Sequence, residues 1–190
     1  MTEAVTLLGT KGGPAIRPGT PMPTATLVQM GGQTVLVDAG LGAARGLCDA
    51  GVALTDLDAI IVTHLHSDHY LELGPLLHTA WTAGLNRPVP VIGPDGLRPY
   101  WAGFCAAMAF DIALRQRDEG RPPLEPLADL HTLDEGERAL GPLRLTALRN
   151  AHPPIEDSFA LRLAQGGRRV VLSGDTAPID AMTGFARGAD

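Results

Sequence analysis

The sequence lacks features that would point to a membrane or secreted protein. No apolar run approaches the roughly 18 to 20 residues that a membrane-spanning helix needs, and the longest candidate, Tyr100–Leu114, is interrupted by Asp111. The N-terminus has no basic stretch followed by an apolar one, so no secretory signal is visible. We therefore expect a protein with no membrane partner.

Cysteine and lysine are both scarce. The two cysteines, Cys48 and Cys105, lie in apolar segments without the spacing of a paired motif, which favours buried free thiols and a reducing cytoplasm. Lys11 is the only lysine, so arginine supplies 14 of the 15 basic residues. Because 21 acidic residues outnumber them and the net charge is −6, we expect no extended surface for a nucleic acid.

The pattern of apolar residues predicts strands, then a mainly helical middle, then strands again. A chain of 190 residues, 45% of them hydrophobic, suits one domain with a sizeable core. This order favours a sheet-rich sandwich with helices outside. The predicted strands cover 5–8, 26–30, 34–37, 59–62, 88–92, 143–148, 159–163 and 170–172. The predicted helices cover 40–50, 71–83, the segment between Pro94 and Gly120, and a last one that begins near Pro178.

The most informative segment is Thr63–His69, directly after the apolar run Ala59–Val62. Four metal-binding side chains fall within it: His64, His66, Asp68 and His69. The first two histidines alternate as at the end of a strand and can face one side, while the Asp-His pair can face a second position. A lone histidine here is usually a packed or surface residue, but four such groups crowded together are costly without a cation. We therefore predict a two-metal site that suits zinc, with manganese or iron as alternatives.

Two later segments offer further ligands, each at the end of a predicted strand. His152 follows the strand 143–148 and would be the third imidazole of one metal, with His64 and His66. Asp175 follows the strand 170–172 and would bridge that ion to the one held by Asp68 and His69. Taken alone, each is a weak signal, because a histidine before two prolines is more often a turn residue and Gly-Asp-Thr is a common turn or helix start. The motif at 64–69 is what makes both of them candidate ligands.

The combined pattern resembles the metallo-β-lactamase superfamily over essentially the whole chain. The matching parts are the HxHxDH motif at 64–69, His152, and the Ser-Gly-Asp-Thr segment at 173–176. The resemblance implies an α+β fold, a four-layer αββα sandwich with a di-metal site at its edge. The segments 7–10 and 173–176 are most similar to the ribonuclease Z and arylsulfatase-like branch. The segment 35–40 resembles an early strand and turn of that family, which implies that Asp38 supports the metal loops. Thr63 is a second candidate support, and a structural threonine and a turn aspartate are equally plausible interpretations of these two residues.

One departure from the family concerns the end of the chain. Members usually add one more histidine to the second metal from a later strand, yet neither His78 nor His131 fits that position. We therefore expect residues 1–190 to be a single metallo-β-lactamase-like domain, truncated at its C-terminus and lacking the last strand and helix. The branch is often dimeric, with the first helix after the motif at the interface, so a homodimer is one expectation.

The other departure concerns the substrate. Ribonuclease Z enzymes that grip tRNA carry a long basic arm between the segments that match His152 and Asp175, but only 23 positions separate these residues here. The short span and the acidic net charge favour a small-molecule ester, such as a phosphodiester or a sulfate ester.

The expected chemistry is metal-assisted hydrolysis of an ester. Two cations would lower the pKa of a bridging water, and the resulting hydroxide would attack the ester, with Asp68 orienting it and accepting its proton. Two alternatives stay open. The chain could be a ribonuclease Z-like endonuclease that matures the 3′ end of tRNA, or a redox or binding member of the same fold.

Overall fold

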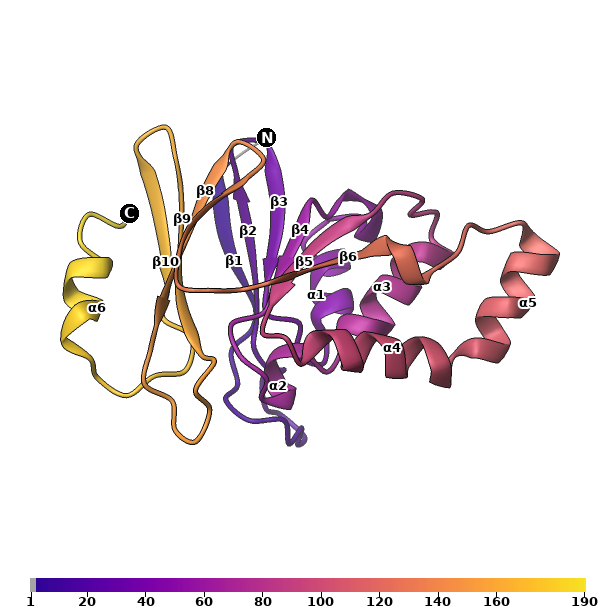
Figure 1. Ribbon diagram of the computed structural model, residues 1–190, viewed down its shortest axis with the longest axis horizontal. Helices are drawn as coiled ribbons and strands as arrows, with labels where there is room; N and C mark the ends of the chain where they lie inside the picture. Colours follow the sequence, from indigo (N-terminus) through magenta and orange to yellow (C-terminus); the bar gives the residue numbers. More distant parts are fainter. Residues whose placement is uncertain (1–2) are drawn as a thin grey trace.

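Two β-sheets lie face to face with helices on the outer side of each, as the computed structural model of residues 3–190 shows (Figure 1). One sheet has the order β1-β2-β3-β4-β5-β6 and the other β10-β9-β8-β7. Strands β1 to β6 are Ala4–Gly9, Ala25–Met30, Gln33–Val37, Ala59–Ile61, Val89–Gly93 and Ala128–Thr132. Strands β7 to β10 are Gly136–Leu140, Leu143–Arg149, Phe159–Gln165 and Arg168–Leu172. The four layers confirm the predicted α+β sandwich.

Helices cover the two outer faces unequally. Five helices lie on the side of the six-stranded sheet, and one, α6, lies outside the four-stranded sheet (Figure 1). Helices α1 to α6 are Ala43–Asp49, Ser67–Tyr70, Leu73–Thr82, Leu97–Ala107, Ala109–Glu119 and Asp180–Phe185, and 3-10 turns cover Leu54–Asp56 and Glu125–Leu127. None of the helices within residues 3–190 is both long and apolar enough to cross a membrane.

Alternation along the strands divides the apolar side chains between two cores. Leu36 and Ile60 face the helices and pack with Trp81 and its neighbours. Val35 and Ile61, one position away on the same strands, face the other sheet, where they meet Phe159 and other residues of β8 and β9. Strands β3, β4, β5 and β6 are parallel, so their C-terminal ends share one edge of the sheet. That edge is where the predicted metal motif emerges.

Three features differ from the sequence-based predictions. Strands β6 and β7 were not predicted, because β7 exposes four of its five residues and depends on pairing with β8 rather than on an apolar face. The long helix after Pro94 divides into α4 and α5 at Met108, which caps both. Both cysteines are free, as expected, but the expected burial is wrong: Cys48 is exposed and Cys105 is only partly buried.

Candidate metal centre

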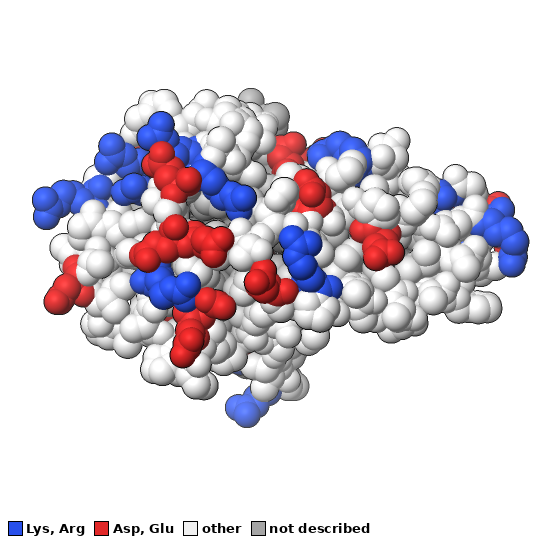
Figure 2. Space-filling model, in the orientation of Figure 1, with Lys and Arg blue, Asp and Glu red and all other residues white. Residues whose placement is uncertain are grey.

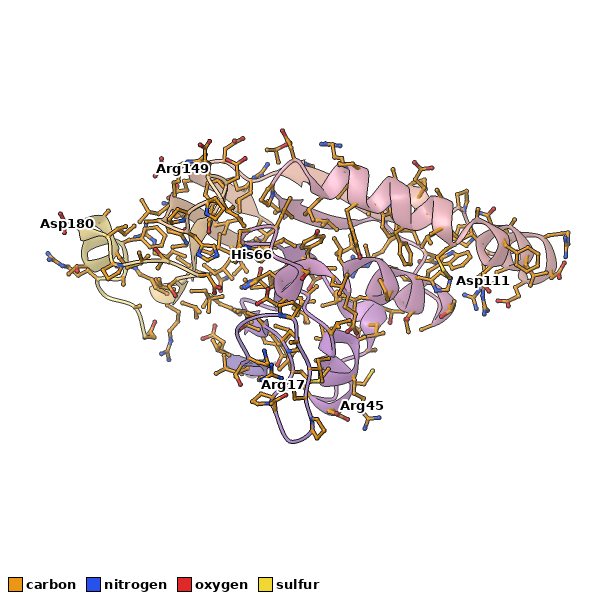
Figure 3. The ribbon with its side chains drawn as sticks, turned by 90° about the horizontal axis from the view of Figure 1, so that it is seen from below. Arg17, Arg45, His66, Asp111, Arg149 and Asp180 are labelled. Carbon is orange, nitrogen blue, oxygen red and sulfur yellow. The ribbon has the colours of Figure 1, made fainter. Side chains whose placement is uncertain are left out.

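Three loops meet at one end of the sandwich and carry the predicted ligands. The first follows β4, the second follows β8 and the third follows β10. The amide of Phe159 donates to the carbonyl of Thr63 at 3.2 Å, and the amide of Ala177 donates to the carbonyl of Ala151 at 2.7 Å. In the view from this end, His66 lies near the centre of the molecule (Figure 3). Backbone pairing therefore joins three segments that are far apart in sequence into one site.

Three ring nitrogens converge in the first half of the site. His64 Nε2 lies 3.2 Å from His66 Nδ1, which lies 2.9 Å from His152 Nε2. Nitrogens bound to one zinc ion at about 2.0 to 2.1 Å in tetrahedral geometry lie slightly more than 3 Å apart, so this spacing matches a shared ion. The grouping of His64, His66 and His152 is the one that the sequence predicted for the first metal.

The ring of His64 is held in the neutral form that a metal ligand requires. It is completely buried. Burial, followed by repulsion from the imidazoles of His69, His152 and His66, lowers the pKa of His64 to about 3. The ring is therefore uncharged at neutral pH, and one of its two nitrogens has a free lone pair.

A second group of candidate metal ligands also includes His64. His64, His69 and Asp175 each offer an atom within 4.8 Å of the others. His69 Nε2 lies 3.6 Å from Asp175 Oδ1 and 3.6 Å from Asp68 Oδ2. This nitrogen is buried and has no hydrogen-bond partner among residues 3–190. An orphaned imidazole nitrogen that faces two carboxylates is what a divalent cation would satisfy, so the donor set fits a second ion.

Asp38 supports both halves of the site from behind. Its carboxylate accepts hydrogen bonds from the Thr63 amide at 2.8 Å and the Thr63 hydroxyl at 3.0 Å, and its Oδ2 lies 2.8 Å from His69 Nδ1. The contact with Nδ1 leaves Nε2 of His69 pointing into the site. The Thr63 hydroxyl also lies 3.1 Å from His64 Nδ1. A carboxylate behind a ligating histidine fixes the orientation of its ring, which is the role predicted for Asp38 and Thr63.

Burial and charge have opposite effects on the pKa values of Asp38 and His69. Burial raises the pKa of Asp38, and its bonds with His69 and Thr63 offset only part of that rise. Burial alone would lower the pKa of His69, but the hydrogen bond and charge of Asp38, with smaller effects of Asp175 and Asp68, outweigh it and raise that pKa. Without a cation, His69 therefore keeps its proton to a higher pH than an ordinary imidazole does.

The loop between β1 and β2 closes over the site. The amide of Gly13 donates to Asp68 Oδ2, and Asp68 is only 4% exposed. On the other side, the carbonyl of Asp68 lies against Gly40, where a Cβ atom would overlap it. Asp68 is thus held by its carboxylate on one side and by its backbone carbonyl on the other, each against a glycine-containing turn.

The two remaining histidines lie outside the site. His78 Nε2 lies 2.8 Å from Asp111 on α5, and His131 Nε2 lies 3.0 Å from Asp129 on β6. This placement agrees with the prediction that neither supplies the additional ligand of the second metal.

One residue that contributes to the site received no role from its sequence. Asn150 follows β8 and donates from Nδ2 to the carbonyl of Ser173 at 2.9 Å, which ties the loop of His152 to the loop of Asp175. Its neighbour Ala151 donates to the Thr176 hydroxyl at 3.2 Å. An asparagine two positions before a candidate ligand is a weak signal, because its partner is 23 residues away.

The comparisons with known proteins agree with this geometry. The family described as "Anti-Pycsar protein Apyc1" matches residues 4–186. A protein named ribonuclease Z from Mycobacterium bovis is 34% identical over 195 aligned positions, which cover 98% of this chain and 67% of that protein. Another ribonuclease Z, from Mycolicibacterium gilvum, is 35% identical and covers 97% of this chain and 65% of its own length. The chain thus spans about two thirds of the length of these relatives.

Solved structures show the same fold. The metallo-β-lactamase fold protein YhfI from Bacillus subtilis superposes with a TM-score of 0.73 at 26% identity, covering 98% of this chain and 68% of that one. The short form of human tRNase Z gives a TM-score of 0.73 at 23% identity, covering 98% and 75% of the two chains. The second likeness is evidence for the fold alone.

These relatives overturn the predicted partners. A small-molecule ester and the exclusion of nucleic acid do not agree with relatives named ribonuclease Z across nearly the whole chain. The absence of a long arm between His152 and Asp175 does not exclude RNA as a substrate. An alignment of 195 positions over 98% of 190 residues leaves about nine positions for extra residues in the Mycobacterium bovis protein, so no long arm lies within the aligned part of that ribonuclease Z either.

The family follows from the fold, the ligand set and the relatives together. The chain belongs to the metallo-β-lactamase superfamily, in its ribonuclease Z branch of ester-bond hydrolases, and to the family described as anti-Pycsar protein Apyc1.

Proposed function

We propose that the protein hydrolyses phosphodiester bonds in RNA with the help of two divalent cations, Zn²⁺ in the first instance. The observation that carries the proposal is the convergence of three imidazole nitrogens at 2.9 and 3.2 Å beside a buried, orphaned His69 Nε2. The ribonuclease Z relatives, at 34 to 35% identity, support RNA as the substrate. Manganese and iron are the alternative metals.

The ligands divide between two positions. His64, His66 and His152 would hold the first cation, and Asp68 with His69 the second, with Asp175 between the two. His64 also lies within 4.8 Å of His69 and Asp175, so it stands between the two cation positions. When bound, the two cations supply activation of water and stabilisation of negative charge on the phosphate oxygens.

Asp68 is the candidate catalytic residue of this site. Its side chain is buried, the amide of Gly13 holds its Oδ2, and that oxygen faces His69 Nε2 at 3.6 Å. A carboxylate held in this way can orient a water molecule and accept its proton. Asp38 has a different role, because its oxygens are occupied by Thr63 and His69 and face away from the reacting position.

The test compares turnover with metal content. We expect the zinc-loaded protein to cleave a precursor tRNA transcript and to hydrolyse bis-p-nitrophenyl phosphate, used as a generic phosphodiester probe, but not p-nitrophenyl sulfate. Plasma mass spectrometry should give two zinc ions per chain. His66→Ala should abolish both activities and lower the zinc content, because it removes the nitrogen shared between His64 and His152.

A matched control separates this effect from a general loss of histidine. His131→Ala also removes an imidazole, but one on β6 that pairs with the exposed carboxylate of Asp129 outside the metal site, so activity and zinc content should stay at the wild-type level. If the zinc-loaded wild type cleaves neither phosphodiester, the proposal is wrong. Two irons per chain would instead favour the redox alternative.

We place the protein in the cytoplasm, because Cys48 and Cys105 are both free and such thiols persist in reducing compartments. The homodimer, and the prediction of a single domain that lacks its last strand and helix, stay predictions.

A further inference from the structure

Three arginines on neighbouring strands of the four-stranded sheet surround one small residue. In the sheet register, Ala164 on β9 lies directly opposite Arg144 on β8 and Arg169 on β10. Arg162 lies two positions before Ala164 on β9 and therefore on the same face. The inner face of these strands carries Leu145, Leu161, Leu163 and other core residues, so the arginines lie on the outer face. The alanine forms the floor of a hollow whose rim carries three guanidinium groups.

The hollow is lined mainly by basic side chains. It encloses about 440 Å³ and is bordered by these three arginines, by Arg168, and by the side-chain-free turn Gly166–Gly167. Arginine side chains, drawn in blue, gather over the end of the sheet that carries the Gly166–Gly167 turn (Figure 2). Glu137 is the only acidic residue that lines the hollow. A local excess of positive charge on a chain with net charge −6 contrasts with the rest of the surface.

The neighbouring groups neutralise only part of this charge. Arg144 lies 3.3 Å from Glu137, and Arg168 lies 3.3 Å from Asp190. Arg162 stacks on the ring of Phe185, and Arg169 forms no ion pair within residues 3–190. Like charges on adjacent positions of a sheet face are destabilising, so the arrangement costs free energy unless an anion lies between them.

The position of the hollow indicates the size of its ligand. Strand β9 starts at Phe159, whose amide bonds to the metal loop, and reaches Ala164 five residues later. At about 3.3 Å per residue, the hollow is roughly 17 Å from the metal end of the strand. A single nucleotide cannot reach both places, whereas an RNA chain can. Guanidinium groups bind phosphate oxygens in a bidentate manner, and backbone phosphates fix the position of a nucleic acid without reading its sequence.

From these observations we infer that the outer face of β8–β10 is a second RNA-contacting site, in which Arg144, Arg162 and Arg169 bind backbone phosphates of a substrate whose scissile bond lies at the metal centre. This inference rests on the proposed function. It also identifies where an acidic protein without a long arm holds a polyanion.

The test uses the full chain with Arg144→Gln and Arg169→Gln combined. We expect KM for precursor tRNA to rise about tenfold with kcat unchanged, and mature tRNA, which is not cleaved, to bind about tenfold more weakly. Loss of two phosphate contacts should reduce the slope of log Kd against log salt by roughly 1.4 to 1.8. Turnover of bis-p-nitrophenyl phosphate should not change, because this probe is too small to reach the hollow.

The matched control is Arg45→Gln combined with Arg117→Gln. These arginines are 81% and 71% exposed, on α1 and α5, and their loss removes the same charge elsewhere. The inference is overturned if the control weakens tRNA binding as much as the test variant does, if the test variant binds tRNA like the wild type, or if the wild type binds no tRNA. Bis-p-nitrophenyl phosphate reports separately on the proposed function: weaker tRNA binding by the test variant supports the inference even if that ester is not hydrolysed. Thermal melting of both double variants checks that each is folded.

Discussion

Replacing Asp38 by asparagine isolates the effect of one buried charge on the metal centre. Asp38 is 3% exposed and lies 2.8 Å from His69 Nδ1 through one oxygen, while the other accepts the amide of Thr63. An asparagine has the same shape and keeps one acceptor, which the Thr63 amide would hold. Its NH₂ group would then face His69 Nδ1, so that nitrogen becomes the acceptor and the proton moves to Nε2. A protonated Nε2 cannot bind a metal ion.

The expected loss follows from this change of tautomer. Removing the hydrogen-bond partner of a metal-binding histidine typically lowers metal affinity tenfold to a hundredfold, which is about 1.4 to 2.7 kcal/mol of binding free energy. The second metal should therefore bind ~10 to 100 times more weakly, while the first, held by His64, His66 and His152, should change less. In the metal-free protein, a neutral hydrogen bond would replace a charge-assisted one, so the free energy of unfolding should fall by about 1 kcal/mol.

The assay is competition for zinc against a chromophoric chelator, combined with urea unfolding in the absence of metal. Asp58→Asn is the matched control, because Asp58 accepts a hydrogen bond from the Thr34 amide at 2.8 Å but lies outside the metal site. It should leave both zinc affinities unchanged. Two zinc affinities equal to the wild type in Asp38→Asn would refute the assignment of His69 Nε2 as a ligand held by Asp38.

Three further predictions concern the loops and the thiols. Gly40→Ala should lower the melting temperature and the zinc content together, because the added Cβ overlaps the carbonyl of Asp68, and a variant that keeps both at wild-type values contradicts this contact. Asn150→Ala should reduce phosphodiester turnover at least tenfold and Asn150→Asp should not restore it, because only the amide can donate to the carbonyl of the loop after β10; kinetics with both variants check this. With iodoacetamide at pH 8, the exposed Cys48 should be labelled and Cys105 should not, because burial raises the pKa of Cys105 to about 11, which peptide mass spectrometry measures.

The metal site was largely predictable because its ligands are local or lie at strand ends. Four of them fall within six residues after the apolar strand β4, and crowded imidazoles and carboxylates have few explanations other than a cation. His152 and Asp175 became candidates through the strands that precede them, and the structure brings both to the same edge. Both strands were recognisable from their alternating or β-branched apolar residues.

Features that depend on pairing between distant segments were not predictable. Strand β7 exposes most of its residues, so no apolar pattern marks it, and only the ladder to β8 makes it a strand. Asn150 donates to a carbonyl 23 residues away, and an asparagine at this position is equally typical of an ordinary turn. The contact of Gly13 with Asp68 spans 55 residues and involves a backbone amide, a group that every residue except proline has.

The prediction of the partner from net charge was wrong because net charge does not describe the local distribution of charges. A total of −6 is a sum over the whole surface, whereas a phosphate backbone responds to the charge within about one Debye length, roughly 8 to 10 Å. Arg144, Arg162 and Arg169 are spread over 26 positions of sequence among acidic residues, and only the antiparallel register of β8, β9 and β10 brings them around Ala164. A sequence average cannot detect such a cluster, because the strands bring together residues that the average treats as independent. The relevant quantity for binding is therefore the charge of one sheet face.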